Sequence, residues 1–274
     1  IFERGALLLR RMLFKDHPYG MRDIGEEESV RTINRDDLIR FYQSRCIPNN
    51  TVIAISGDIE PEEVFKKVEA LFKDVQRRDL IKPLKNLPAD GSPGSQTVKM
   101  DKEQALLMLG FKTVAMNNPD KYPLNVLSGL LSGTSGRLFV ALREKSGLAY
   151  TMGSMQKLGL DTGFILFYVA TTIDKLSEAK KLLLNEISAI KQGLITEGEL
   201  DAAKKELICS QDILIETNAA NSFQAALDEL YGLGYDNLYK FENETNKVTK
   251  YDIIKVANKY IDMNSCAEVV IQPE

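Results

Sequence analysis

The sequence of 274 residues contains a single histidine, His17. Zinc peptidases commonly hold their metal with two His and a Glu at helical spacing, and one histidine cannot supply that set. His17 precedes Pro18 in a turn, with no Cys or further His nearby. A hydrogen bond in a turn or at an interface is therefore its expected role, and metal ligation is the less favoured alternative. A Ser or Cys nucleophile would also be left without a suitable histidine base.

Other absences narrow the class of protein further. The three cysteines, Cys46, Cys209 and Cys266, lie far apart and form no metal-ligand pattern, which fits structural thiols or a reduced interior. No run of about 18 apolar residues is present, so no membrane span is expected. Gly57-Asp58 lacks a glycine-rich phosphate loop and is interpreted as the end of a strand. The first residues lack Met and the pattern of a signal peptide, so we expect the chain to start inside a longer protein.

The composition is that of a soluble globular protein. Apolar residues make up 44% and charged residues 27% of the chain, and the formal net charge is −4. A duplex-binding protein needs a concentrated basic surface, so nucleic acid is not an expected partner. The length allows one large domain or two ordinary domains.

The first part of the chain predicts helices and one strand. Apolar residues at helical spacing predict a helix over residues 1–14, which Pro18 cannot continue. Asn34 is an expected N-cap for a helix over 35–46. The β-branched run Thr51–Ser56 predicts a buried strand. Residues 76–97 contain several Pro and Gly without periodicity, which predicts a linker and a domain boundary.

Beyond the linker the pattern alternates between strands and helices. Strands are expected at residues 104–111, 150–157, 163–172 and 266–271, and helices at 119–131, 176–192, 197–217, 222–233 and 249–260. The segment 163–172 is apolar on both faces, which predicts a central strand. Thr196 and Glu199 have the spacing of a capping box at the start of a helix.

One stretch, residues 133–150, holds two polar side chains that core packing does not explain. Arg143 precedes a break at Gly147, and Tyr150 follows it. An Arg offers a planar set of donors and a Tyr hydroxyl a single donor, so the two could meet at one carbonyl oxygen. On this chemistry alone, a surface salt bridge and an aromatic at the edge of the core are the simpler interpretation. The residues by themselves therefore predict an α/β or α+β protein in two parts, without a self-contained active site.

Several short motifs, in order along nearly the whole chain, carry a family resemblance. They are His17-Pro-Tyr-Gly20, Gly25 with Glu28-Ser29, Asp37-Leu38 with Phe41-Tyr42, Pro48-Asn49-Asn50, Gly57-Asp58, Gly136-Arg-Leu-Phe139, Leu142-Arg-Glu-Lys145, Gly147-Leu-Ala-Tyr150, Thr196 with Glu199-Leu200, and Val248-Thr249. With these motifs the chain resembles the M16 (pitrilysin/insulinase-like) zinc metallopeptidases, which include mitochondrial processing peptidase.

The resemblance implies an α+β fold of the LuxS/MPP-like metallohydrolase type, with helices layered on a mostly antiparallel sheet. Residues 1–75 would be the C-terminal part of the first M16 domain, 76–97 the linker, and 98–274 a complete second domain. In the family the two domains close around an unfolded peptide.

The resemblance also implies where the active site lies. The family's zinc motif, His-x-x-Glu-His with a more distant Glu, belongs upstream of the His17-Pro-Tyr-Gly20 segment, and this chain contains none of it. Zinc is therefore expected in the parent protein and not in this chain, which would hold no catalytic or metal-binding residue. The second domain of the family supplies an Arg and a Tyr seven residues apart that bind substrate. Arg143 and Tyr150 match both the residue types and the spacing.

The resulting hypothesis is a fragment of a zinc metalloendopeptidase that binds unfolded peptides through Arg143 and Tyr150 and is not active alone. The alternative is a naturally inactive M16 subunit that assists an active one in a heterodimer, and a structural core protein of a respiratory complex is a third possibility. Expected partners are a peptide substrate and either the rest of the first M16 domain or an active M16 subunit, in a dimer. The resemblance fits bacterial or organellar parents, with the bacterial cytoplasm or periplasm as the expected compartment.

Overall fold

The computed structural model describes residues 1–80, 91 and 93–274. The chain forms two compact units. The first unit, called the sheet unit below, comprises residues 1–23, 86–208 and 243–274, and the second, called the helical unit, comprises residues 24–85 and 209–242. The expected domain boundaries at 75 and 98 stay a prediction, and residues 81–90 and 92 of the expected linker lie outside the described residues.

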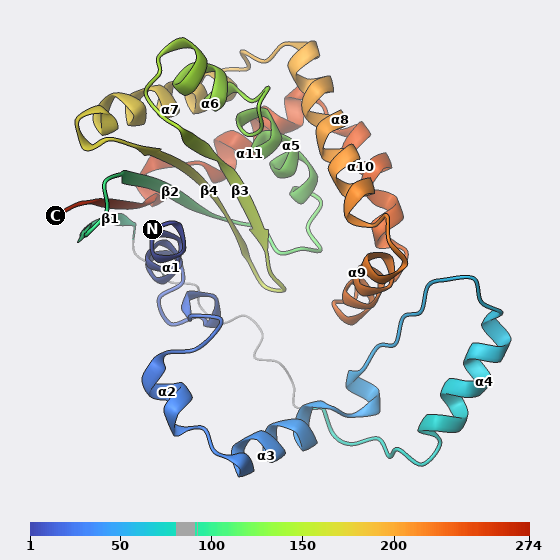
Figure 1. The fold of residues 1–274 in the computed structure, drawn as a ribbon. Coiled ribbons are helices and arrows are strands. Elements are labelled where there is room, and N and C mark those ends of the chain that lie inside the picture. The colour runs from blue at the N-terminus through green and yellow to red at the C-terminus, as the bar shows by residue number, and fades with distance from the viewer. Residues whose placement is uncertain (81–90, 92) are drawn as a thin grey trace. The chain divides into compact units, whose positions relative to one another are not determined.

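Figure 1 labels the helices and strands. The helices are α1 (Phe2–Leu13), α2 (Glu27–Thr32), α3 (Arg35–Arg45), α4 (Pro61–Phe72), α5 (Lys121–Leu131), α6 (Arg137–Phe139), α7 (Leu176–Lys191), α8 (Glu197–Leu214), α9 (Asn218–Leu230), α10 (Phe241–Lys247) and α11 (Lys250–Tyr260). The strands are β1 (Gly94–Met100), β2 (Ala105–Thr113), β3 (Thr151–Leu158), β4 (Gly163–Thr171) and β5 (Ala267–Pro273). A π-helix, Val140–Lys145, continues α6.

The sheet unit is built on one five-stranded sheet of order β1-β5-β2-β4-β3. Only the β1–β5 pair is parallel, and the other three pairs are antiparallel. The expected α+β fold with a mostly antiparallel sheet is therefore confirmed. Strand β4 lies between β2 and β3 and is buried on both faces, as its unbroken apolar sequence predicts.

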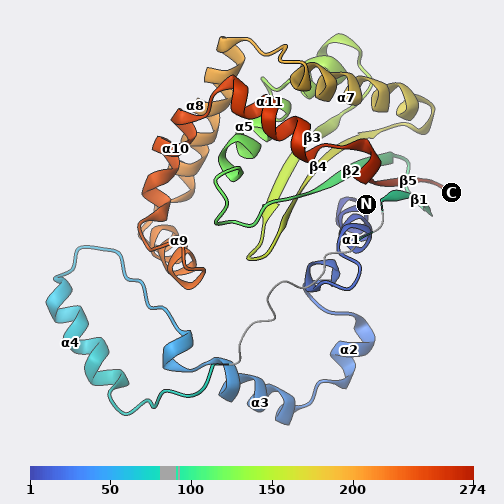
Figure 2. The same cartoon turned by 180° about the vertical axis from the view of Figure 1, so that it is seen from behind.

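One face of the sheet carries the main core. Alternate residues of β2 and β4, among them Leu109 and Phe167, pack there with side chains of α5, α7 and α11. The view from behind in Figure 2 shows α11 beside α5 and α7 on this face. The start of α5 is tied to α11 because Asp120 Oδ2 accepts hydrogen bonds from Lys259 Nζ at 2.9 Å and Tyr260 Oη at 2.6 Å.

Helix α1 covers the opposite face of the sheet. Leu8, Leu9 and Leu13 pack against the other set of β2, β4 and β5 side chains, such as Met108 and Val269. A Cβ atom at Gly110 of β2 would lie 2.5 Å from Leu9 Cδ2, so the Leu9 side chain rests directly on the strand backbone. The sheet therefore has two apolar faces, and α1 is an integral part of the unit that contains it.

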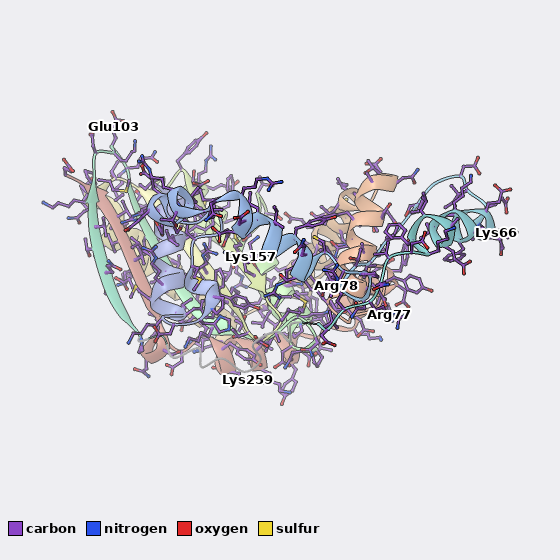
Figure 3. The ribbon with its side chains drawn as sticks, turned by 90° about the horizontal axis from the view of Figure 1, so that it is seen from below. Lys66, Arg77, Arg78, Glu103, Lys157 and Lys259 are labelled. Carbon is purple, nitrogen blue, oxygen red and sulfur yellow. The ribbon has the colours of Figure 1, made fainter. Side chains whose placement is uncertain are left out.

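The helical unit has far less core. Helices α2, α3 and α4 contain no buried side chain. The expected N-cap is confirmed, because Asn34 accepts hydrogen bonds from the backbone N–H groups of Asp36 and Asp37. After α4 the chain returns to α3: Asn49 exchanges two hydrogen bonds with the Arg78 backbone, and the Arg78 guanidinium donates to Gln43 O at 3.1 Å (Figure 3).

Two expectations about strands differ from the structure. Residues 51–56 form no strand, and none of their side chains is buried, so the prediction of a buried strand is wrong. Within the described residues, the sheet lies in the other unit, and no strand of the helical unit pairs with this segment. Strand β1 begins at Gly94, inside the stretch expected as linker. The prediction missed this strand because its sequence is polar, and the sequence can be polar because most of an edge strand is exposed to water.

Candidate functional site

The stretch 133–150 begins with a turn that favours glycine. Gly133 has φ +79°, a left-handed conformation, and Gly136 N–H donates to Gly133 O at 3.2 Å. A Cβ at Gly136 would lie 1.9 Å from Ser132 O, so a larger residue does not fit there. Gly136 is the N-cap of α6, so this turn sets the entry point of the helix that carries Arg143.

A π-helical segment and a tight turn bring Tyr150 back toward Arg143. π-helical turns are rare in proteins, and those that occur often lie at functional sites. The π-helix ends at Lys145, and Gly147, with φ +58°, donates its N–H to Arg143 O at 3.1 Å. Leu148 and Ala149 then both donate to Leu142 O, at 2.8 and 3.1 Å. The chain therefore doubles back within three residues of Gly147, and Tyr150 immediately precedes β3.

Arg143 and Tyr150 lie against each other. The Arg143 Cζ atom is 4.7 Å from the centre of the Tyr150 ring and 5.3 Å from the centre of the Phe139 ring. A cation over an aromatic ring is attracted by the electrons of the ring face, and this contact leaves N–H groups of the guanidinium for other partners. Both side chains are solvent-accessible, and Tyr150 is 70% exposed.

The simpler interpretation of these residues does not fit this geometry. Among the described residues the structure shows no carboxylate paired with the Arg143 guanidinium, so a surface salt bridge does not account for it. Tyr150 is too exposed to be an aromatic of the core edge. The two side chains together form a small exposed surface with one fixed cation and one phenol hydroxyl.

Sequence reasoning missed the ion pair of a second arginine, Arg137, on the same helix. Its Nε and Nη2 atoms donate to the two carboxylate oxygens of Glu199 at 2.8 and 3.0 Å. Nη2 also donates to Leu194 O, and Nη1 lies 3.7 Å from Glu186 Oε2. The Arg137 side chain is only 13% exposed. Unlike Arg143, its donors are taken up by the protein itself.

Glu199 also completes the capping box that the sequence predicts. Its Oε2 accepts from the backbone N–H and the hydroxyl of Thr196, both at 2.8 Å, and its own N–H donates to Thr196 Oγ1 at 3.2 Å. Burial raises the pKa of Glu199, but the hydrogen bonds from Arg137 and then Thr196 outweigh it and lower the pKa from 4.5 to about 2. Glu199 is therefore charged at any physiological pH.

The depressed pKa gives a testable dependence of stability on pH. A carboxylate whose folded-state pKa is lowered stabilises the fold above its unfolded pKa, and that contribution is lost as the pH falls toward the folded value. The gap in unfolding free energy between the wild type and Glu199→Gln should be constant near neutral pH and shrink between pH 4.5 and about 2. Urea unfolding of both proteins over this range measures it. A gap that is independent of pH would contradict the assignment.

His17 is buried, with 2% of its surface exposed. Its Nδ1 accepts a hydrogen bond from Tyr19 N–H at 3.2 Å, which confirms the expected role in a turn. Its Nε2 has no hydrogen-bond partner among the described residues and lies 4.0 Å from Asp161 Oδ2. Tyr19 Oη in turn accepts from Leu160 N–H at 2.7 Å, so this turn holds the β3–β4 connection.

The described residues do not suit a zinc ion. In residues 1–80, 91 and 93–274 no group of three or more His, Cys, Asp or Glu side chains is placed to hold a metal. His17 is buried beside Tyr19 at a ring distance of 4.3 Å, and its Nε2 lies 4.0 Å from Asp161 Oδ2. In the same part of the chain, no helix has the length and apolar character needed to cross a membrane.

Comparisons with known proteins identify the family of the chain. A sequence model described as "Peptidase M16 inactive domain" matches residues 32–207, well over half of the chain. The chain belongs to the M16 peptidase family. The M16 resemblance of the sequence motifs is therefore confirmed, together with the inactive-domain type.

Curated relatives of this M16 chain are named as zinc proteases. An "uncharacterized zinc protease" of Rickettsia bellii is 27% identical over 260 residues, which cover 94% of this chain and 62% of the relative. The "uncharacterized zinc protease YmxG" of Bacillus subtilis is 28% identical over 242 residues, 88% of this chain and 58% of the relative. The M16 chain thus spans about three fifths of the length of these two proteins.

A solved structure shares the fold. "The crystal structure of a protease from Helicobacter pylori" aligns with a TM-score of 0.87 and 20% identity, and the alignment covers 100% of the M16 chain and 67% of that protein. At this identity the likeness establishes the fold alone.

Proposed function

We propose that this M16 chain is the substrate-binding part of a zinc metalloendopeptidase and is not active alone. Arg143 and Tyr150 bind a carbonyl oxygen of an unfolded peptide and stabilise the negative charge that develops on it during hydrolysis. The zinc is held by another part of the parent protein or by a partner subunit. Zinc protease names among the relatives support zinc as the metal of the family.

The observation that carries this proposal is that Arg143 is exposed and has no carboxylate partner among the described residues. Its Cζ atom lies over the Tyr150 and Phe139 rings, 4.7 and 5.3 Å from their centres, and no described carboxylate is paired with its guanidinium. A cation fixed by ring stacking needs no reorganisation when a peptide oxygen arrives, and such preorganised donors are the usual means of stabilising an oxyanion. The Tyr150 hydroxyl supplies a second donor next to it.

The helical unit offers surface for the expected protein partner. Large apolar side chains on α3 and α4 are exposed, among them Leu38, Phe41, Phe65 and Leu71. Large apolar side chains left in water are typical of surfaces that contact other protein. It supports the proposal that the rest of a first M16 domain, or an active M16 subunit, covers this unit.

Zinc analysis tests whether the metal is bound outside this chain. The chain by itself should bind no stoichiometric zinc and hydrolyse no unfolded peptide. The full-length parent, with any partner subunit it needs, should contain zinc and be inactivated by a chelator. The parent with Arg143→Ala should keep its full zinc content, because Arg143 is not a ligand. Zinc bound tightly by the isolated chain, or lost in the variant, would overturn the proposal.

A second candidate is a naturally inactive subunit that lends Arg143 and Tyr150 to an active M16 partner. The description of the matching family model as an inactive domain supports this candidate. Co-purification with a second M16 chain, and peptide hydrolysis only by the mixture, would distinguish this candidate. Hydrolysis by the full-length parent alone would exclude it.

A further inference from the structure

Two motifs that lie far apart in the sequence meet in one ion pair. Arg137 belongs to the Gly136-Arg-Leu-Phe139 motif at the start of α6, and Glu199 belongs to the capping box of α8. The pair is bidentate, with both contacts at 3.0 Å or less, and its two residues are 62 positions apart in the sequence. Planar, two-point pairing fixes direction as well as distance, which lysine cannot reproduce.

We propose that the Arg137–Glu199 ion pair is a positioning device that sets the orientation of the helix bearing Arg143, and through it the Arg143–Tyr150 pair. The inference rests on the proposed function of that pair. Arg137 itself cannot bind a peptide, because its guanidinium is 13% exposed and its donors point at Glu199, Leu194 O and Glu186. Its effect on substrate must therefore act through the helix.

The geometry explains how such a restraint reaches Arg143. Helix α6 has only three residues, and it passes without interruption into the π-helix that carries Arg143. Leu138 and Leu142, both fully buried, fix one side of this segment in the core. Arg137, the first residue of α6, ties this helix to the loop before α8 and to α7. Figure 1 shows α6 beside α7. A short helix held at its start and along one side has little freedom to rotate.

Loss of this restraint should lower catalysis more than it lowers peptide affinity. Small misplacements of a catalytic constellation, on the order of 1 Å, cost up to about 100-fold in rate. Arg137→Lys keeps the charge but not the two-point contact, and we expect it to lower kcat of the full-length parent by about tenfold with KM changed less than about threefold.

A double-mutant cycle separates positioning from general stability. In the Arg143→Ala background, Arg137→Lys should cause no further loss of kcat/KM, because the group that it positions is gone. Equal fractional losses in both backgrounds would show that the ion pair is structural only, and so would wild-type kcat in the Arg137→Lys single variant. Wild-type kcat/KM in the Arg143→Ala variant would instead overturn the proposed function itself.

Two further variants control for poor folding of Arg137→Lys and for the general effect of losing an ion pair. Glu199→Gln removes the charge but keeps a residue that suits a capping box, so it should repeat the cycle even where Arg137→Lys folds poorly. Lys180→Met removes a comparable part-buried ion pair, Lys180–Glu268 at 2.6 Å between α7 and β5, and should leave kcat unchanged. A loss of kcat in Lys180→Met as large as in Arg137→Lys would contradict a specific positioning role.

Discussion

Arg143→Ala and Tyr150→Phe should each lower kcat/KM for peptide hydrolysis by on the order of 100-fold in the full-length parent. Under the proposed function each change removes a donor to the peptide carbonyl oxygen: the guanidinium, whose Cζ lies 4.7 Å from the centre of the Tyr150 ring, or the phenol hydroxyl of Tyr150, which precedes β3. Steady-state kinetics with a quenched fluorescent peptide, beside zinc analysis of each variant, measures the effect. Wild-type turnover in both variants would refute the role of the pair.

Matched variants show whether the lost group or a general disturbance is responsible. Tyr150→Phe keeps the ring on which Arg143 stacks, so only the hydroxyl is tested. Tyr251→Phe removes the hydroxyl of another exposed tyrosine, 72% accessible on α11, and should leave kcat/KM unchanged. Since the two donors are expected to act on one oxygen, the combined Arg143→Ala and Tyr150→Phe variant should lose less than the product of the single losses.

The second large effect concerns stability. Leu9→Ala should lower the unfolding free energy of the sheet unit by about 2–5 kcal/mol, the usual cost of truncating a fully buried Leu. Leu9 is completely buried, and its side chain rests on the backbone of Gly110 in the central part of the sheet. Hydrogen exchange of β2 and β4 amides, followed by mass spectrometry, reports on this unit without contributions from the helical unit.

The control for this prediction lies on the same helix. Arg4→Ala changes an exposed residue of α1 and should alter exchange of β2 and β4 very little. Removal of residues 1–23 should have the strongest effect, because the apolar face formed by residues such as Met108 and Val269 would be left in water. Unchanged exchange in Leu9→Ala would show that α1 is not part of the sheet unit's cooperative core.

The sheet unit was predictable wherever a segment's own pattern determines its structure. The unbroken apolar run of β4 marks a central strand, and Thr196 with Glu199 marks a helix start. The segment 51–56 has the same β-branched character but pairs with no described strand, since pairing depends on a partner that local sequence does not reveal. Strand β1 was missed for the opposite reason: its polar residues suit an edge, and its partner β5 lies at the other end of the chain.

The candidate site was predictable only in part. The resemblance to the M16 family points to Arg143 and Tyr150 through their types and seven-residue spacing, but it does not reveal the π-helical turn that brings the guanidinium over the ring. The Arg137–Glu199 contact was out of reach, because a contact across 62 residues depends on how α6, α7 and α8 pack. The sequence indicates both motifs, but only the three-dimensional structure shows that they are in contact.

The most direct test of the account compares two ligands of the full-length parent. A phosphinic peptide has tetrahedral oxygens that stand in for the developing oxyanion, whereas an uncleaved peptide of the same sequence represents the ground state. Tyr150→Phe should weaken phosphinic peptide binding by on the order of 100-fold, in step with its loss of kcat/KM, and weaken ordinary peptide binding less than about threefold. Equal weakening of both ligands, or none of either, would contradict the assignment of Tyr150 and Arg143 to the developing charge.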